Sequence, residues 1–144
     1  MSVATILKVK GTHVEMAPPD TTLYTIVWTL KAKDIGAMVV SEDGNTVLGL
    51  VSERDIIRGL TDHGARLLTL PASKLMTSPV VTCRPEESIT AVMARMTRHR
   101  TRHLPVFEGS KLCGIVSIGD VVKHRLDELQ LEADVLRENL LTSH

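Results

Sequence analysis

The sequence predicts an α/β fold of the mixed α+β kind, made of two pseudo-two-fold-related β-α-β-β-α repeats that pack through their sheets, with an extended C-terminal helix. One segment occurs twice, as GLVSERDIIR at 49–58 and GIVSIGDVVK at 114–123. The segments that precede these two copies also match in order, so the repeat covers most of the chain. A copy of about 60 residues buries only a modest core by itself. We therefore expect the two copies to form one domain, 1–144.

Each copy is expected to contain a short strand, a helix, two strands joined by a turn, and a second helix. Opening strands are expected near 13–15 and 79–82. The first helix of each copy is indicated by apolar residues at helical spacing: Leu23, Ile26, Val27 and Leu30, and then Ile89, Val92, Met93 and Met96. Paired strands are expected at 37–40 with 47–51 and at 104–107 with 112–116, around the turns 43–45 and 108–110.

The repeat also sets the expected boundaries. Repeat one spans about 5–60, a linker 61–71, and repeat two about 72–126. The helix after the first copy is expected to end by Gly59, whereas the helix that begins at Ile118 extends to about 141. Apolar residues follow this second helix at mixed three- and four-residue steps: Val122, Leu126, Leu129, Ala133, Leu136 and Leu140. Two interpretations of this stripe stay open, packing on its own module or contact with a second copy or a partner.

The composition weighs against several classes of protein. The 144 residues have a formal net charge of zero and only 2% are aromatic, which disfavours a base-stacking nucleic-acid surface. No apolar run approaches the length of a membrane span, and the N-terminus lacks a signal-peptide pattern. Cys83 and Cys113 form no CxxC motif, so we expect buried thiols and a cytoplasmic location.

A Ser-x-x-Asp junction between strand and helix occurs in both copies, as Ser52 with Asp55 and Ser117 with Asp120. One interpretation is a helix cap, in which the serine accepts from the N–H of the aspartate and the aspartate reaches back. The other is a ligand site. Helix N–H groups converge on an anion at such a junction, and a carboxylate can accept hydrogen bonds from both hydroxyls of a ribose.

Four motifs in this order resemble a tandem pair of cystathionine-β-synthase (CBS) domains, also called a Bateman module. They are GLVSERD at 49–55, MTSPVV at 76–81, RHLPV at 102–106 and GIVSIGD at 114–120, and the resemblance covers roughly 5–126. It implies a regulatory module that binds adenosine-containing ligands such as AMP, ADP, ATP, NAD(H) or S-adenosylmethionine in clefts between the repeats. It also implies homodimers in which two modules form a flat disc.

The resemblance implies a set of ligand-binding residues in this chain. Asp55 and Asp120 would bind ribose hydroxyls, and Ser52 and Ser117 would bind ribose or phosphate oxygens. Backbone groups near Val14 and Val80 would contact the adenine edge. The expected set is completed by Ala37, Thr77, Pro105 and Gly119 in the matching motifs and by the basic residues Arg54, Arg100, Arg102 and His103.

Basic residues gather at 95–103, where the sequence reads RMTRHRTRH. Arg95 and Arg98 fit a solvated helix end as well as a binding site. Arg100, Arg102 and His103 directly precede a strand that the resemblance places beside the cleft. Because guanidinium groups bind phosphate in a bidentate manner, we expect phosphate contacts there.

The two copies differ around the expected sites. Arg54 in the first junction is a further phosphate candidate, and the second junction has Gly119 at the matching place. Repeat one opens with KGTHV at 10–14, where repeat two has MTSPV at 76–80. We therefore expect the two sites to differ in ligand, or one of them to be empty.

The other polar residues do not indicate a metal site or a catalytic site. His99 and His103 lack a third ligand for a metal, and no Ser-His-Asp or Cys-His arrangement can be argued, so neither a metal nor catalytic residues are expected. The remaining histidines, His13, His63, His124 and His144, are expected on the surface.

The leading hypothesis is thus a non-catalytic, homodimeric sensor of adenine nucleotides that regulates a separate protein. A structural interaction module, whose Ser-x-x-Asp motifs are only helix caps, is the first alternative. A weak nucleic-acid binder that uses the basic residues 95–103 is the second.

Overall fold

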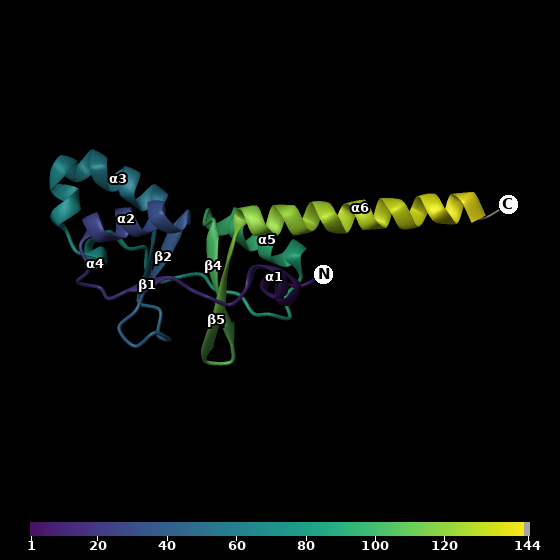
Figure 1. Ribbon diagram of the computed structural model, residues 1–144, viewed down its shortest axis with the longest axis horizontal. Helices are drawn as coiled ribbons and strands as arrows, with labels where there is room; N and C mark the ends of the chain where they lie inside the picture. The colour runs from purple at the N-terminus through teal and green to yellow at the C-terminus, as the bar shows by residue number, and fades with distance from the viewer. Residues whose placement is uncertain (143–144) are drawn as a thin grey trace.

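The computed structural model describes residues 1–142 and confirms a mixed α+β fold with a long C-terminal helix (Figure 1). Two lobes lie side by side, and each contains one repeat. The elements in chain order are α1 (Val3–Lys10), β1 (Met16–Ala17), α2 (Leu23–Lys33), β2 (Ala37–Val40), β3 (Gly49–Ser52), α3 (Glu53–His63), a 3-10 helix η1 (Gly64–Thr69), α4 (Ala72–Leu75), α5 (Ile89–His99), β4 (His103–Glu108), β5 (Lys111–Ser117) and α6 (Ile118–Thr142).

The sheets are small and equivalent in register. In the first lobe β2 pairs parallel to β1 and antiparallel to β3, and in the second lobe β4 pairs antiparallel to β5. Ala37 lies opposite Ser52, and His103 lies opposite Ser117. The two serines therefore occupy equivalent positions in the two lobes, each at the junction between a strand and the helix that follows it.

The expected helices at 23–30 and 89–96 are confirmed as α2 and α5. Each is capped by a hydroxyl, because Thr22 accepts from the N–H of Thr25 and Ser88 from the N–H of Ala91. Their apolar stripes are buried, with Leu23, Ile26 and Ile89 fully removed from solvent.

The opening strands were expected in the wrong places. In repeat one the strand is the two-residue β1, which begins three residues after His13. In repeat two no strand forms at 79–82; a single parallel bridge joins Cys83 to Val106 instead. Pro79 has no N–H for a ladder, and the segment that it begins runs along a cleft instead of pairing.

The expected end of α3 at Gly59 was also wrong, since the helix continues to His63. Gly59 is buried inside it, and a Cβ there would come within 2.3 Å of Leu75 and 2.7 Å of Leu67. The glycine thus allows η1 and α4 to pack against the helix. The predicted linker 61–71 consists mostly of the end of α3 and of η1.

Helix α1 was not expected, and it packs on the second repeat although it precedes the first (Figure 1). Val3, Ile6 and Leu7 are buried in the same cluster as Ile89 and Leu104. Helix α1 therefore completes the core of the second lobe.

The two lobes contact each other through their sheets. Val39 and Leu50 from the first sheet form a cluster that includes Leu112 and Ile115 of β5. At the turns, the Asn45 amide donates to the Ser110 carbonyl at 2.9 Å and accepts from the Leu112 N–H at 2.9 Å.

Helix α6 begins in the second lobe and extends well past α5 and α1 (Figure 1). His124, expected on the surface, is buried with Val121 where α6 contacts the lobe. His144 lies outside the described residues. In the part of the chain that the structure describes, no helix has the length and apolar character needed to cross a bilayer.

Candidate functional site

Both Ser-x-x-Asp junctions form capping boxes. The Ser52 N–H donates to Asp55 Oδ2 at 2.9 Å, and Ser52 Oγ accepts from the Asp55 N–H at 3.3 Å. At the second junction the corresponding distances between Ser117 and Asp120 are 2.9 and 3.1 Å. The capping interpretation is therefore confirmed at both helix starts, and each aspartate is held at the N-terminal end of a helix.

The two aspartates have different further partners, on Oδ1 of Asp55 and on Oδ2 of Asp120, the oxygen that also accepts from the Ser117 N–H. Asp55 Oδ1 accepts from the Thr77 hydroxyl at 2.9 Å. Asp120 instead lies 2.6 Å from the Lys10 ammonium, which also donates to the Ile115 carbonyl at 3.0 Å. Burial acts to raise the pKa of Asp120, but Lys10 and the Ser117 N–H outweigh it, so this pKa lies below its ordinary value.

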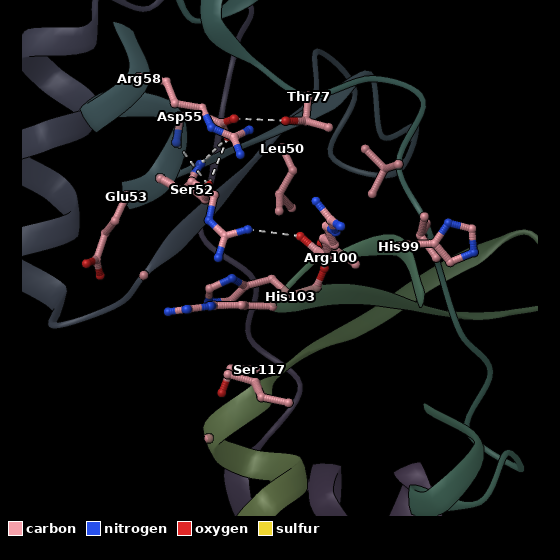
Figure 2. A pocket seen from close by; sticks show the side chains of 18 of the residues that line it. Leu50, Ser52, Glu53, Asp55, Arg58, Thr77, His99, Arg100, His103 and Ser117 are labelled. Carbon is pink, nitrogen blue, oxygen red and sulfur yellow. Dashed lines mark hydrogen bonds between the residues drawn. The ribbon is translucent and has the colours of Figure 1, made fainter. Parts of the chain in front are cut away.

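A cleft of about 810 Å³ opens at the first junction and reaches across to the second lobe (Figure 2). The first lobe contributes the end of β3 and the start of α3. The second lobe contributes the segment 77–81, the end of α5, the start of β4, and the junction between β5 and α6. Ten of the fourteen residues expected at a ligand site line this cleft: Ser52, Arg54, Asp55, Thr77, Val80, Arg100, Arg102, His103, Ser117 and Gly119.

The cleft is positively charged. Four arginines line it, Arg54, Arg58, Arg100 and Arg102, against the two carboxylates of Glu53 and Asp55. Arg54 donates to the Arg100 carbonyl at 3.2 Å and so connects the lobes. Within residues 1–142 none of these four guanidinium groups is in an ion pair. The excess of unpaired guanidinium groups favours a ligand that carries phosphates.

The segment 77–81 presents unused backbone groups to the cleft. Val80 and Val81 line it, and within residues 1–142 no hydrogen bond reaches the N–H or C=O of either residue. Backbone groups that line a cleft without a protein partner can bind the polar edge of a planar ring.

His103 is half-buried at the start of β4, and its imidazole faces the cleft (Figure 2). Burial and, to a smaller extent, the nearby Lys10 ammonium lower the pKa of His103 to about 4. The ring is therefore neutral at pH 7 and can offer a hydrogen bond but no charge. A Cβ on Gly36 would lie 3.0 Å from its Nε2, so the glycine allows the ring to approach the first lobe.

Four expected residues do not line the cleft. Asp120 is paired with Lys10. Val14 and Ala37 are buried in the cluster between the lobes, and Pro105 is buried inside β4. Asp120 does not line this cleft or the smaller one beside Arg54 and Arg100.

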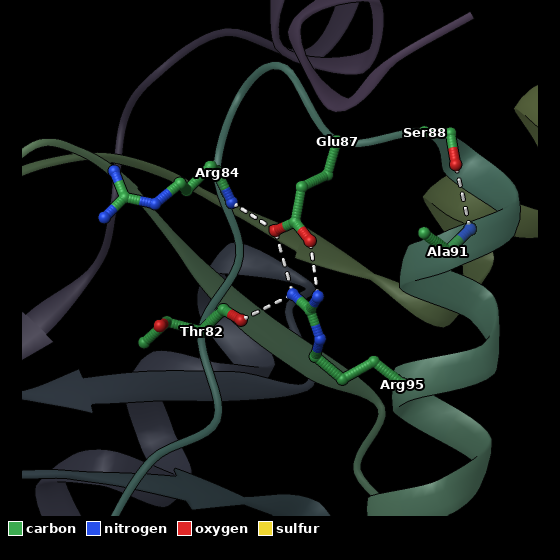
Figure 3. A network of polar contacts seen from close by, with 6 residues as sticks. All are labelled: Thr82, Arg84, Glu87, Ser88, Ala91 and Arg95. Carbon is green, nitrogen blue, oxygen red and sulfur yellow. Dashed lines mark hydrogen bonds and ion pairs between the residues drawn. The ribbon is translucent and has the colours of Figure 1, made fainter.

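Arg95 lies outside the cleft and serves the fold (Figure 3). Its guanidinium makes a two-pronged ion pair with Glu87 and donates to the Thr82 carbonyl at 3.0 Å. The hydrogen bonds from Arg95 hold the pKa of Glu87 below its ordinary value. This contact attaches the segment before α5 to the helix.

Sequence reasoning missed several cleft residues, above all Glu53, Arg58, Pro79 and His99. Arg58 could have been found, because it lies four residues after Arg54 and therefore on the same face of α3. His99 is the last residue of α5 and lines the cleft, and the next residue, Arg100, ends the helix in a left-handed conformation with φ of 53°.

The described residues offer neither a metal cluster nor a reactive thiol. No group of three or more His, Cys, Asp or Glu side chains within 1–142 could hold a metal ion. Cys83 is buried, and burial raises the pKa of its thiol to about 12. Cys113 is half-buried and unpaired.

Comparison with known proteins agrees with this architecture. The model of the CBS domain family matches twice, over residues 8–62 and 72–127. The chain is 31% identical to the mitochondrial CBS domain-containing protein CBSX3 of Arabidopsis thaliana, over 90% of this chain and 68% of that protein.

Solved structures show the same fold. The CBS-domain protein ATU1752 from Agrobacterium tumefaciens is 40% identical, with a TM-score of 0.84 over 87% of this chain and 99% of that one. The CBS domain pair of protein MJ0100, solved with 5′-methylthioadenosine and S-adenosyl-L-methionine, has a TM-score of 0.78 at 18% identity, over 89% of this chain and 98% of that one. The two family matches cover most of this chain, which belongs to the CBS domain family as a tandem pair.

Proposed function

We propose that this protein is a non-catalytic sensor that binds one adenine nucleotide in the cleft between its two CBS repeats. The observation that supports this most directly is the composition of that cleft. It combines the anchored carboxylate of Asp55, the free backbone of Val80 and Val81, and four unpaired arginines.

Each part of the cleft suits one part of the ligand. Asp55 still has lone pairs on both oxygens and can accept from the ribose hydroxyls. The backbone of Val80 and Val81 can hydrogen-bond the adenine edge, beside the apolar side chains of Leu50 and Pro79. Arg54, Arg58, Arg100 and Arg102 can bind phosphates. AMP, ADP, ATP and NAD(H) therefore fit better than S-adenosylmethionine, whose sulfonium is positive.

Regulation follows from the position of the ligand between the lobes. A nucleotide that contacts Asp55 in one lobe and Arg102 in the other binds one relative arrangement better, and so shifts the population toward it. We expect a homodimer that reports this change to a separate protein. The unpaired Cys83 and Cys113 favour the reducing cytoplasm as its compartment.

A thermal-shift panel tests the proposal, with AMP, ADP, ATP, NAD+, NADH and S-adenosylmethionine. At a hundred times its dissociation constant a ligand adds about 2.7 kcal/mol to the free energy of unfolding. Asp55→Asn should remove the shift, and Asp120→Asn, in the junction that Lys10 occupies, is the matched control that should keep it. If no adenosine compound shifts the melting temperature, the protein is the ligand-free interaction module instead.

The same purified protein can be used to test the alternative function, binding of nucleic acid. Binding of DNA or RNA through the arginines would weaken steeply with salt. Retention on single-stranded RNA that falls steeply as salt is raised, without any nucleotide shift, would replace the proposed function.

A further inference from the structure

The outer half of α6 leaves the body of the protein. Every described residue after Glu128 is exposed, and Figure 1 shows the helix running on past α5 and α1. Leu129 and Leu136 on this half are 43% and 64% exposed. Isolated helices of this length are marginal in water, so contacts with another molecule would stabilise it.

Its apolar residues follow a heptad pattern. Val122, Leu126, Leu129, Ala133 and Leu136 are separated by alternating steps of four and three, and Leu140 continues the series. Such residues are the d and a positions of a two-stranded coiled coil. Leu126 is 61% exposed although it lies close to the body, so the stripe is accessible from its beginning.

The stripe lies on a different face from the contacts with the body. Val121 and His124 are buried against the second lobe. At 3.6 residues per turn, the stripe lies roughly 120° around the helix from them. A second helix can therefore lie along α6 without displacing α5 or α1.

The charges beside the stripe are complementary to a second copy of the same helix. With Leu126 and Ala133 at a, Glu132 is at g and Arg137 at e. Neither makes an ion pair within residues 1–142, although Arg125 and Glu128 beside them do. In a parallel pair, g of one helix lies beside the next e of the other, so Glu132 would meet the partner's Arg137 twice by symmetry.

The opposite orientation lacks this complementarity. A full-length antiparallel pair, which places Leu126 against the partner's Leu136, brings e against e and g against g. Lys123 would then face the partner's Arg137, and Glu132 would face the partner's Glu132. Like charges at these positions disfavour that arrangement.

From the heptad pattern and the two unpaired charges, we infer that α6 pairs with α6 of a second copy as a parallel coiled coil. The inference does not depend on nucleotide binding, because the stripe and the cleft share no residue.

Light scattering after gel filtration of the full chain at micromolar concentration tests the pairing. The wild type should be a dimer, and Leu129→Glu combined with Leu136→Glu should be a monomer. Leu131→Glu is the matched control, since Leu131 is 57% exposed off the stripe, and it should stay dimeric. A wild-type monomer, or a dimer that survives the paired substitution, would overturn the inference.

A charge swap and a cross-link test the orientation. Glu132→Arg alone, and Arg137→Glu alone, should each raise the dimer dissociation constant by about tenfold, and the two together should restore it. Leu136→Cys in a Cys113→Ser background should oxidise to a covalent dimer, because parallel helices place this position opposite itself. No rescue by the double swap, together with no cross-link, would rule out the parallel pair even if the chain is dimeric.

Discussion

The Lys10 ammonium lies 2.6 Å from Asp120 Oδ2, the oxygen that also accepts from the Ser117 N–H, whereas at the other junction the Thr77 hydroxyl donates to Asp55 Oδ1, outside the capping box. The two aspartates are equivalent in sequence and in their capping boxes. One faces an open cleft, and the other is neutralised by a cation from α1. The doubled motif therefore gives one carboxylate per chain that is not paired with a cation.

We expect the wild type to bind one nucleotide per chain and Lys10→Met to bind two, because removal of the ammonium frees Asp120. Calorimetric titration measures the stoichiometry directly. Lys8→Met, on the exposed face of the same helix, is the control and should leave it at one. Two nucleotides bound to the wild type would show that Lys10 does not close the second site.

Thr77→Val should weaken nucleotide binding about tenfold, which corresponds to about 1.4 kcal/mol. The substitution keeps the shape of the side chain but removes the hydroxyl that orients Asp55, so the carboxylate loses its fixed position for the ribose. The dissociation constant, measured by fluorescence with a labelled adenine nucleotide, reports the effect. Thr82→Val is the control, because only the carbonyl of Thr82 is used; equal losses in both variants would argue against a specific role for Thr77.

His103 should make the protein less stable in mild acid. The pKa of His103 is about 4 in the folded chain and 6.5 ordinarily, so between these values the unfolded chain binds more protons. The stabilisation is complete above pH 6.5 and is lost as the pH falls toward 4, by up to about 3 kcal/mol.

Urea unfolding at several pH values between 4 and 7.5 measures this loss. His103→Gln should flatten the pH dependence in that window, whereas His13→Gln, at an exposed position, should not. The same slope in wild type and His103→Gln would assign the titration to another group.

Glu87 and Arg95 should be coupled by about 1 kcal/mol in a double-mutant cycle of Glu87→Gln and Arg95→Met. Their side chains are 22% and 24% exposed, so solvent screens the pair only in part. The lowered pKa of Glu87 means that this stabilisation is present above its ordinary pKa of 4.5 and is lost as the pH falls below it.

Chemical unfolding at pH 7 and at pH 3.5 checks both statements. The coupling energy should be present at pH 7 and smaller at pH 3.5. Arg98→Met is the control on the same helix and should show no coupling to Glu87. A coupling that does not change with pH would mean that the contact is packing and not charge.

The periodic features could be predicted from the sequence. Apolar spacing placed α2 and α5, because a helix that buries one face must repeat its apolar residues every three or four positions, and the same spacing placed α6, whose stripe is exposed. The repeated Ser-x-x-Asp placed both junctions, because a capping box is made by residues three apart. Ser52 and Asp55 meet because of the capping box itself, whereas Thr77 and Val80 reach the same cleft from a later segment of the chain.

Short irregular segments could not be predicted in this way. The segment 79–82 has the apolar residues of a strand, but it has no neighbouring strand to pair with over that length. Helix α3 passes through Gly59 because Leu67 and Leu75 need the space that a side chain would take. Both outcomes depend on which other segment of the chain packs against the residues concerned. The local sequence pattern does not contain that information.

The sequence by itself determined that there are two repeats, where their helices lie and that each repeat presents one serine and one aspartate at a strand end. Only the tertiary structure decided that the two aspartates differ. Lys10 reaches Asp120 because α1 crosses to the second lobe, and these residues are 110 positions apart. The periodicity of apolar residues predicts which face of a single helix or strand is buried. It does not predict which lobe α1 packs on, and the Lys10–Asp120 ion pair depends on that packing.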